Sequence, residues 1–75
     1  MNIKADDREI ATWINVFNER VGHSPTVREL AEAFGVSVGT AHLAISRLAG
    51  ERLITVEKPR RRKITVNMEA VDSLK

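Results

Sequence analysis

The spacing of apolar residues along this chain predicts three helices followed by a β-hairpin. Between residues 6 and 21 the apolar positions recur every three or four residues, which is the spacing of one face of an α-helix. Asp6 is placed to cap the start of this helix and Gly22 to end it. Trp13 lies inside the apolar stripe, so we expect it to anchor the core; stacking on nucleic-acid bases is the alternative. The stripe consists of Ile10, Trp13, Ile14, Phe17 and Val21.

The segment that follows predicts two helices joined by a tight turn. Thr26 and Glu29 have the spacing of a capping box. Gly35 suits the left-handed backbone that ends a helix, and Ser37 is a good cap for the next one. The two apolar faces consist of Leu30, Ala31 and Phe34, and of Ala41, Ala44, Ile45 and Leu48. This is the layout of a helix-turn-helix, which places its second helix in the DNA major groove.

We predict that the first of these helices spans about 27–34 and that the second, the recognition helix, spans about 37–52. Beyond it the apolar period shortens to two, which predicts a hairpin over 53–67. Pro59 belongs in the loop of this hairpin because it cannot donate to a strand ladder. The outward strand residues are Thr55, Glu57, Lys63 and Thr65, and the inward ones are Ile54, Val56, Ile64 and Val66.

The last segment, 68–75, has apolar residues at near-helical spacing: Met68, Val71 and Leu74. It is either a short helix that packs on the domain, a helix that pairs two copies of the chain, or a frayed tail.

With 75 residues, the chain is expected to form one domain over 1–75. It contains no cysteine, no bilayer-length apolar run and no apolar segment at its start. We therefore expect a soluble, cytoplasmic protein without disulfides. Association with the nucleoid is expected only if the chain binds DNA.

The net charge of +2 is unevenly distributed along the chain. Residues 1–35 carry four basic and six acidic side chains, whereas residues 36–75 carry eight basic and four acidic ones. Five of the basic side chains fall within residues 58–63. A solvated basic face is the simplest interpretation, but so dense a run favours contact with an anion. Either a polyanion such as DNA or the acidic surface of a protein would satisfy it.

The segment from Thr26 to Val66 resembles the DNA-binding domain of GntR-type bacterial regulators and, more loosely, MarR-like and LexA-like domains. The resemblance covers 41 of the 75 residues without a gap. It implies a three-helix winged helix-turn-helix, mainly α with a small β-hairpin as the wing, and an edge strand from residues 23–25. The residues that carry it are Thr26, Val27, Arg28, Glu29, Leu30, Ala31, Gly35, Val36, Ser37, Thr40, Ala44, Arg47, Leu48, Glu51, Leu53 and Ile54.

Predicted DNA contacts fall on the recognition helix, at the start of the helix before it, and on the wing. On the recognition helix they are Ser37, Val38, Gly39, Thr40, His42, Ser46 and Arg47. At the start of the preceding helix they are Thr26 and Arg28, as contacts to the DNA backbone. On the wing they are Lys58, Arg60, Arg61, Arg62 and Lys63, which suit phosphates or a narrow minor groove.

Two features depart from the GntR-type pattern. An arginine run stands where the family usually has a glycine at the wing tip. The outward residues at the start of the recognition helix include no Arg, Lys, Asn or Gln, the side chains that form bidentate pairs with bases. Thr40 and His42 can still donate hydrogen bonds, Val38 can touch a thymine methyl group, and Gly39 permits close backbone approach. We therefore expect modest base discrimination. Taken by itself, His42 is more readily explained as an ordinary surface histidine.

The function predicted from the sequence is that of a small bacterial, phage or plasmid repressor acting on double-stranded DNA. The alternative is a protein-interaction module that docks on an acidic partner through exposed Val38, Leu43 and the basic wing. A homodimer is left open by the sequence, because helix-turn-helix regulators commonly bind two half-sites. No cofactor, metal ion or enzymatic activity is predicted, since His23 and His42 lie in different elements without a paired nucleophile or carboxylate.

Overall fold

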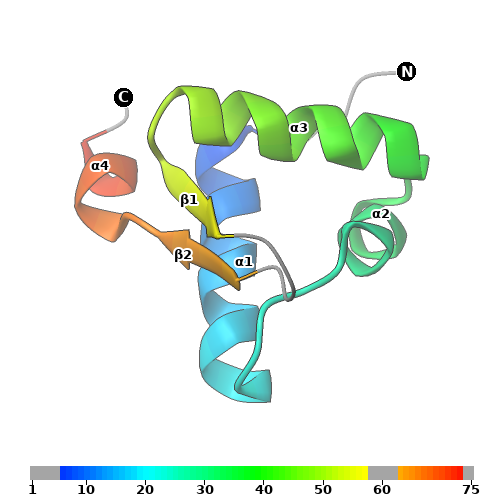
Figure 1. The fold of residues 1–75 in the computed structure, drawn as a ribbon, viewed down its shortest axis with the longest axis horizontal. Helices are drawn as coiled ribbons and strands as arrows, with labels where there is room; N and C mark the ends of the chain where they lie inside the picture. The colour runs from blue at the N-terminus through cyan, green and yellow to red at the C-terminus, as the bar shows by residue number, and fades with distance from the viewer. Residues whose placement is uncertain (1–5, 58–62, 74–75) are drawn as a thin grey trace.

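The computed structural model describes residues 6–57 and 63–73, and these residues form helices packed on a two-stranded sheet (Figure 1). In chain order the elements are α1 (Asp7–Val21), α2 (Val27–Phe34), α3 (Val38–Gly50), β1 (Ile54–Glu57), β2 (Lys63–Val66) and α4 (Met68–Asp72). Three helices followed by an antiparallel hairpin form a winged helix-turn-helix, which confirms the predicted fold class. In Figure 1, α3 lies across one end of α1, with α2 on one side and the hairpin and α4 on the other.

The predicted caps set the ends of the first two helices. Asp6 accepts a hydrogen bond from the backbone N–H of Glu9 at 2.8 Å, and Gly22 ends α1 in the left-handed conformation, at φ 90°. At α2, the Thr26 side chain accepts from the Glu29 backbone, and the Glu29 carboxylate accepts from the Thr26 backbone. Gly35 then turns the chain at φ 67°. An L side chain is strained there, which is why glycine suits this turn.

The core lies where α1, α2, α3, the sheet and α4 meet. Its largest fully buried side chains are Ile10, Ile14, Leu30, Leu48, Ile54 and Val71. Trp13 is half-buried against this core, with its ring centroid 5.7 Å from that of Phe34 and 5.3 Å from that of Phe17. The position of Trp13 confirms its predicted packing role. None of the described polar or charged residues is buried, so the core is apolar throughout the described chain.

The recognition helix α3 ends at Gly50, two residues before the predicted end. Arg52 adopts a left-handed conformation at φ 63°, and the N–H of Leu53 donates to the carbonyl of Leu48 at 3.0 Å. This turn places Leu53 in the core, with 3% of its surface exposed, before the first strand begins. Burial of Leu53 therefore takes precedence over continuation of the helix, and the predicted strand start at residue 53 is one residue early.

The sheet contains β1 and β2 in antiparallel register, with Ile54 opposite Val66 and Val56 opposite Ile64. The predicted alternation is confirmed: Ile54 and Ile64 are buried and Val56 and Val66 are half-buried, whereas Thr55, Glu57, Lys63 and Thr65 are exposed. Residues 23–25 do not form the edge strand that the family resemblance implies; the described sheet has two strands. Val21, the last member of the predicted stripe, is exposed because it ends α1 just before the chain turns away.

The C-terminal segment packs on the domain as a short helix. The Asn67 side chain caps α4 by accepting from the N–H of Ala70 at 3.2 Å. Val71 is buried, and α4 lies against α1. The segment Met68–Asp72 is thus a helix packed on the domain rather than a frayed tail; Leu74 lies outside the described residues. No helix within the described ranges is long and apolar enough to cross a membrane.

Candidate nucleic-acid interface

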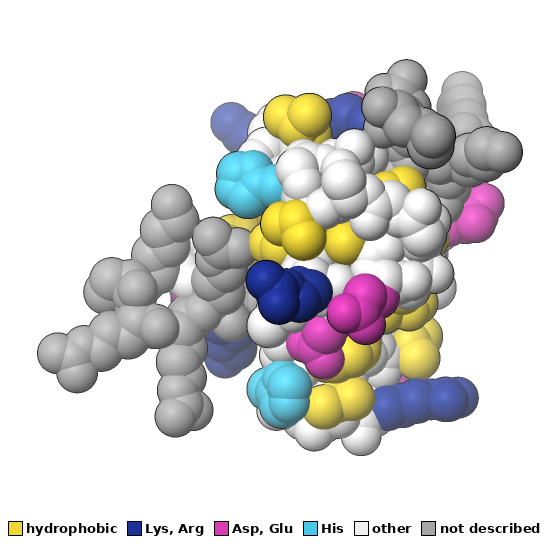
Figure 2. Space-filling model, turned by 90° about the vertical axis from the view of Figure 1, so that its right-hand side faces the viewer, with side chains coloured by type: hydrophobic (Ala, Val, Ile, Leu, Met, Phe, Trp, Pro, Cys, Tyr) yellow, Lys and Arg dark blue, Asp and Glu magenta, His cyan; other side chains and the backbone are white. Residues whose placement is uncertain are grey.

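Helix α3 exposes one side along its length, and most of the contacts predicted on this helix lie on it. Its other side is buried on α2 and the core through Ala41, Ala44, Ile45 and Leu48. The exposed side includes Val38, Gly39, His42, Leu43 and Ser46. At 100° per residue, Gly39, Leu43 and Ser46 fall along the middle of that side. In Figure 2, which looks onto α2 and the start of α3, hydrophobic side chains reach the surface among polar and charged ones.

His42 and Ser46 border a shallow groove between α3 and the sheet. The groove has a volume of about 230 Å³, and its other lining residues are Pro25, Val27, Ile45, Ala49, Val56 and Ile64. Both residues are exposed predicted contacts. They line the groove together with Val56 and Ile64 of the strands, so they lie towards the hairpin. A nucleic acid held between α3 and the hairpin would meet these two side chains.

Two of the residues predicted to contact DNA through a hydroxyl group, Ser37 and Thr26, also cap helices. Ser37 Oγ accepts from the backbone N–H of Thr40 at 3.1 Å and donates to Thr40 Oγ1 at 3.0 Å. Thr26 Oγ1 accepts from the N–H of Glu29 at 3.0 Å. Capping holds the starts of α2 and α3 in place, and an N-terminal turn exposes backbone N–H groups that attract anions. Arg28 is exposed on the first turn of α2.

Arg47, predicted as a DNA contact, is bonded to the start of α1. Its Nη2 lies 2.7 Å and its Nε 3.1 Å from Oδ1 of Asp7, and half of its side chain remains exposed. Glu51 joins the same cluster by hydrogen bonding to Asp7. The sequence did not predict this cluster. Asp7 and Arg47 are 40 residues apart, and a separation of that length carries no pattern that identifies two residues as partners.

The two carboxyl groups of this cluster have opposite pKa shifts. Desolvation by burial opposes ionisation of Asp7, but the hydrogen bonds from Glu51 and Arg47, together with the charge of Arg47, outweigh it and lower the pKa of Asp7. The hydrogen bond to Asp7 is the main cause that raises the pKa of Glu51, followed by desolvation and the charge of Asp7. Asp7 is thus the more acidic of the two carboxyl groups.

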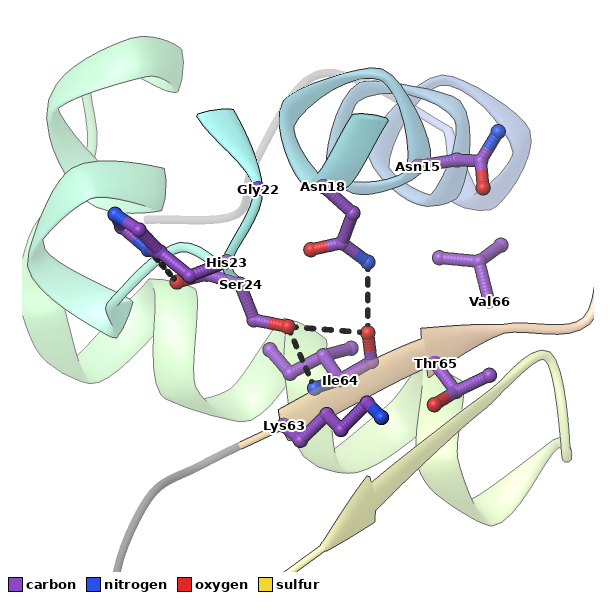
Figure 3. Close-up of a pocket in the computed structure, with 9 residues that line it drawn as sticks. All are labelled: Asn15, Asn18, Gly22, His23, Ser24, Lys63, Ile64, Thr65 and Val66. Carbon is purple, nitrogen blue, oxygen red and sulfur yellow. Dashed lines mark hydrogen bonds between the residues drawn. The ribbon is translucent and has the colours of Figure 1, made fainter. Parts of the chain in front are cut away.

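The strand β2 is attached to the helices by side chains from two other segments (Figure 3). Ser24 Oγ accepts from the N–H of Ile64 at 2.8 Å and donates to its carbonyl at 3.2 Å. Asn18 Nδ2 donates to the same carbonyl at 2.8 Å, while its Oδ1 is buried without a partner. These contacts fix the strand beside Lys63, which is exposed. The remaining predicted wing contacts, Lys58, Arg60, Arg61 and Arg62, lie outside the described residues.

Helix α3 brings little charge to the described part of the interface. Helix α3 contains no carboxylate, and its ionisable side chains are His42 and Arg47. Within residues 6–57 and 63–73, no group of three or more His, Cys, Asp or Glu side chains is arranged to hold a metal ion.

Comparison with known families decides the identity of the fold. The family model for bacterial regulatory proteins of the gntR family matches residues 9–64 of the sequence, well over half of the chain. The chain belongs to the GntR family. It therefore carries a winged helix-turn-helix domain of DNA-binding transcription regulators, a non-enzymatic family whose members bind DNA and typically form dimers. No curated protein matches the chain. The match also includes most of α1, which the resemblance noted in the sequence did not reach.

Proposed function

We propose that this GntR-family protein is a small bacterial, phage or plasmid repressor that inserts the start of α3 into the DNA major groove. The observation that carries the proposal is the exposed side of α3. It presents small, apolar and neutral polar residues from Ser37 to Ser46, and the helix contains no carboxylate that would repel a phosphate. Recognition helices of this layout contact base edges through their N-terminal residues.

The hairpin would lie on the flanking backbone or in the minor groove. Lys63 is exposed at the start of β2, and the run Arg60, Arg61 and Arg62 precedes it in the sequence. Arginine side chains in such a run suit phosphates and the negative potential of a narrow minor groove. Thr26 and Arg28 would contact the backbone from the start of α2. Base selection by α3 would be modest, since its exposed N-terminal residues include none that pairs bidentately with a base.

The test is fluorescence anisotropy of a labelled duplex pool of random sequence, titrated with the protein at increasing salt concentrations. If four to six phosphates are neutralised per monomer, log K falls against log salt with a slope of roughly −4 to −5. The triple variant Arg60→Ala, Arg61→Ala, Arg62→Ala should lose affinity and reduce the slope by about 3. Transcription from a promoter that overlaps a selected site should then fall when the protein is added, if it is a repressor.

A matched control is Arg20→Ala, which removes an exposed arginine from the last turn of α1 that is not among the predicted contacts. It should leave the salt slope within about 1 of that of the unchanged protein. Absence of duplex binding even at low salt would reject the proposal.

A second candidate function is docking on an acidic protein, and the exposure of two apolar side chains on α3 favours it. Leu43 is 71% exposed and Val38 is 48% exposed. Such residues are also found where helices dock on proteins. Stable capture of a protein by the unchanged chain, lost in Leu43→Ala and combined with failure to bind duplex DNA, would support this function over the first.

We further propose that the protein acts as a homodimer in the cytoplasm, at the nucleoid. Family members typically dimerise. Two protomers related by a two-fold axis would bind two inverted half-sites.

A further inference from the structure

Contact with the DNA backbone does not explain why Leu43 is exposed on α3. Its exposed fraction exceeds that of the other large apolar residues that reach the surface in the described chain, Val16, Val21 and Val38. A single exposed leucine is common on protein surfaces and by itself indicates nothing. The position of Leu43 on the exposed side of α3 is what suggests a function for it.

Leu43 lies in the middle of the exposed side of α3, between two small residues. Gly39 precedes it by one turn and Ser46 follows it by one turn, and residues at this spacing are neighbours on a helix surface. Neither neighbour has a side chain as long as that of leucine. If α3 enters the major groove, Leu43 therefore projects towards the base edges farther than the residues before and after it.

The chemistry of leucine restricts what it can contact in that groove. Its side chain has no hydrogen-bond donor or acceptor, so it cannot satisfy the polar atoms of guanine, adenine or cytosine. The apolar group that a base pair presents in the major groove is the 5-methyl group of thymine. Val38, also exposed, offers a second apolar contact near the start of the helix.

We infer that α3 selects its DNA site through thymine 5-methyl groups, with Leu43 as the residue that determines this specificity. The inference rests on the proposed function and names the bases that the recognition helix selects. It also accounts for a recognition surface without Arg, Lys, Asn or Gln at its N-terminal half, because contact with a methyl group requires none of them.

The experiment compares a duplex with its deoxyuridine counterpart. The tightest-binding duplex is selected from the random pool and synthesised again with deoxyuridine in place of thymidine at one position at a time. Deoxyuridine keeps the base pairing and the phosphates and lacks only the methyl group. At each contacted position the affinity, measured by anisotropy, should fall roughly fourfold, the effect of one buried methyl group. The salt slope should stay the same, because no phosphate contact changes.

The variant Leu43→Ala assigns the effect to the residue. It should bind the thymidine and deoxyuridine duplexes equally at the positions that Leu43 contacts, and alanine is compatible with a helix, so the fold should remain intact by circular dichroism. The matched control is Val16→Ala, which shortens an exposed apolar side chain on α1 and should keep the discrimination.

Two results would overturn the inference while leaving DNA binding established. One is equal affinity of the unchanged protein for the two duplexes at every position, and the other is full discrimination in Leu43→Ala. Duplex affinity unchanged in Leu43→Ala would likewise overturn it and would favour a protein contact for this leucine. Failure of the unchanged protein to bind any duplex at low salt would reject the proposed function, and the inference with it.

Discussion

Ser24 uses its side chain where an edge strand would have used its backbone. Its hydroxyl group bonds to both the N–H and the carbonyl of Ile64, which are the groups that a third strand would have paired with. Asn18 adds a second bond to the carbonyl. The outer edge of β2 is thus covered at Ile64 without a ladder, and the position of the hairpin depends on two side chains of other segments.

Replacing Ser24 by alanine should destabilise the fold and loosen the hairpin. The change leaves the N–H of Ile64 without a partner, which costs about 1–2 kcal/mol in the free energy of unfolding. Urea denaturation measures this loss, and faster hydrogen exchange at the Ile64 amide localises it. Ser73→Ala, which removes an exposed hydroxyl bonded to the carbonyl of Glu69, is the control and should cost less than about 0.5 kcal/mol. Equal effects of the two changes would contradict a specific role for Ser24.

The cluster of Asp7, Arg47 and Glu51 makes stability depend on pH in the acidic range. Because the pKa of Asp7 is lowered in the folded protein, its carboxylate stabilises the fold above the unfolded value. That contribution is lost as the pH falls through the lower, folded value. The pKa of Glu51 is raised, so Glu51 acts in the opposite sense: it favours the fold when protonated, and this is lost as the pH rises through its folded value.

Asp7→Asn should therefore destabilise the protein at neutral pH but not in acid. The expected loss in unfolding free energy at pH 7 is less than about 1 kcal/mol, because the Arg47 side chain is half exposed and the pair is screened by water. The difference from the unchanged protein should shrink at about pH 3, below the usual aspartate pKa. Urea denaturation at both pH values tests this, with Asp72→Asn on α4 as the control. A difference that persists in acid would rule out the ion pair as its cause.

At the scale of single elements, α3 combines a good cap with a glycine in its first turn. Ser37 holds the start of the helix, yet Gly39 weakens the same turn relative to alanine. A Cβ atom added at Gly39 would lie 3.9 Å from Ser37 Oγ, which is an ordinary contact. Packing within the protein thus gives no reason for glycine at this position. Close approach of the helix backbone to DNA would give one.

Gly39→Ala is therefore expected to separate stability from binding. The substitution should raise the unfolding free energy by about 0.5–1 kcal/mol, because alanine is the better helix former. It should weaken duplex binding, because its methyl group lies on the side of α3 that approaches the bases. Gly50→Ala, at the other end of α3, is the matched control: it too has open space around it and should leave duplex affinity unchanged. Unaltered affinity in Gly39→Ala would show that the backbone does not approach the groove there.

At the scale of the whole molecule, the proposed dimer has a geometric consequence. A two-fold pair of winged helices would place two copies of α3 in successive major grooves on one side of the duplex. Native mass spectrometry should find two chains on a duplex with two inverted half-sites about 10 base pairs apart, centre to centre. Changing the spacing by about 5 base pairs rotates the second site to the opposite side and should abolish cooperative binding. Cooperativity that is independent of spacing would exclude a rigid dimer.

The local elements of this fold could be predicted because their causes are local. A cap and the residue it binds lie three positions apart, as Asp6 and Glu9, Thr26 and Glu29, and Ser37 and Thr40 do. The left-handed turn after α2 requires a residue such as Gly35, and the alternation of Ile54 and Val56 follows from the pleat of a strand. Sequence alone therefore determined the helices, the turn, the hairpin and the exposed side of α3.

The tertiary structure decided what depends on residues far apart in the chain. Burial of Leu53 ends α3 two residues early, and the packing of α4 on α1 makes the C-terminal segment a helix rather than a frayed tail. Arg47 pairs with a residue 40 positions away, and Ser24 bonds to Ile64 across the same separation. Spacing along the chain carries no information about such partners, because they meet only when the elements pack. The sequence thus determined which side of α3 is exposed, and the packing decided which of its side chains, such as that of Arg47, are already held by other residues.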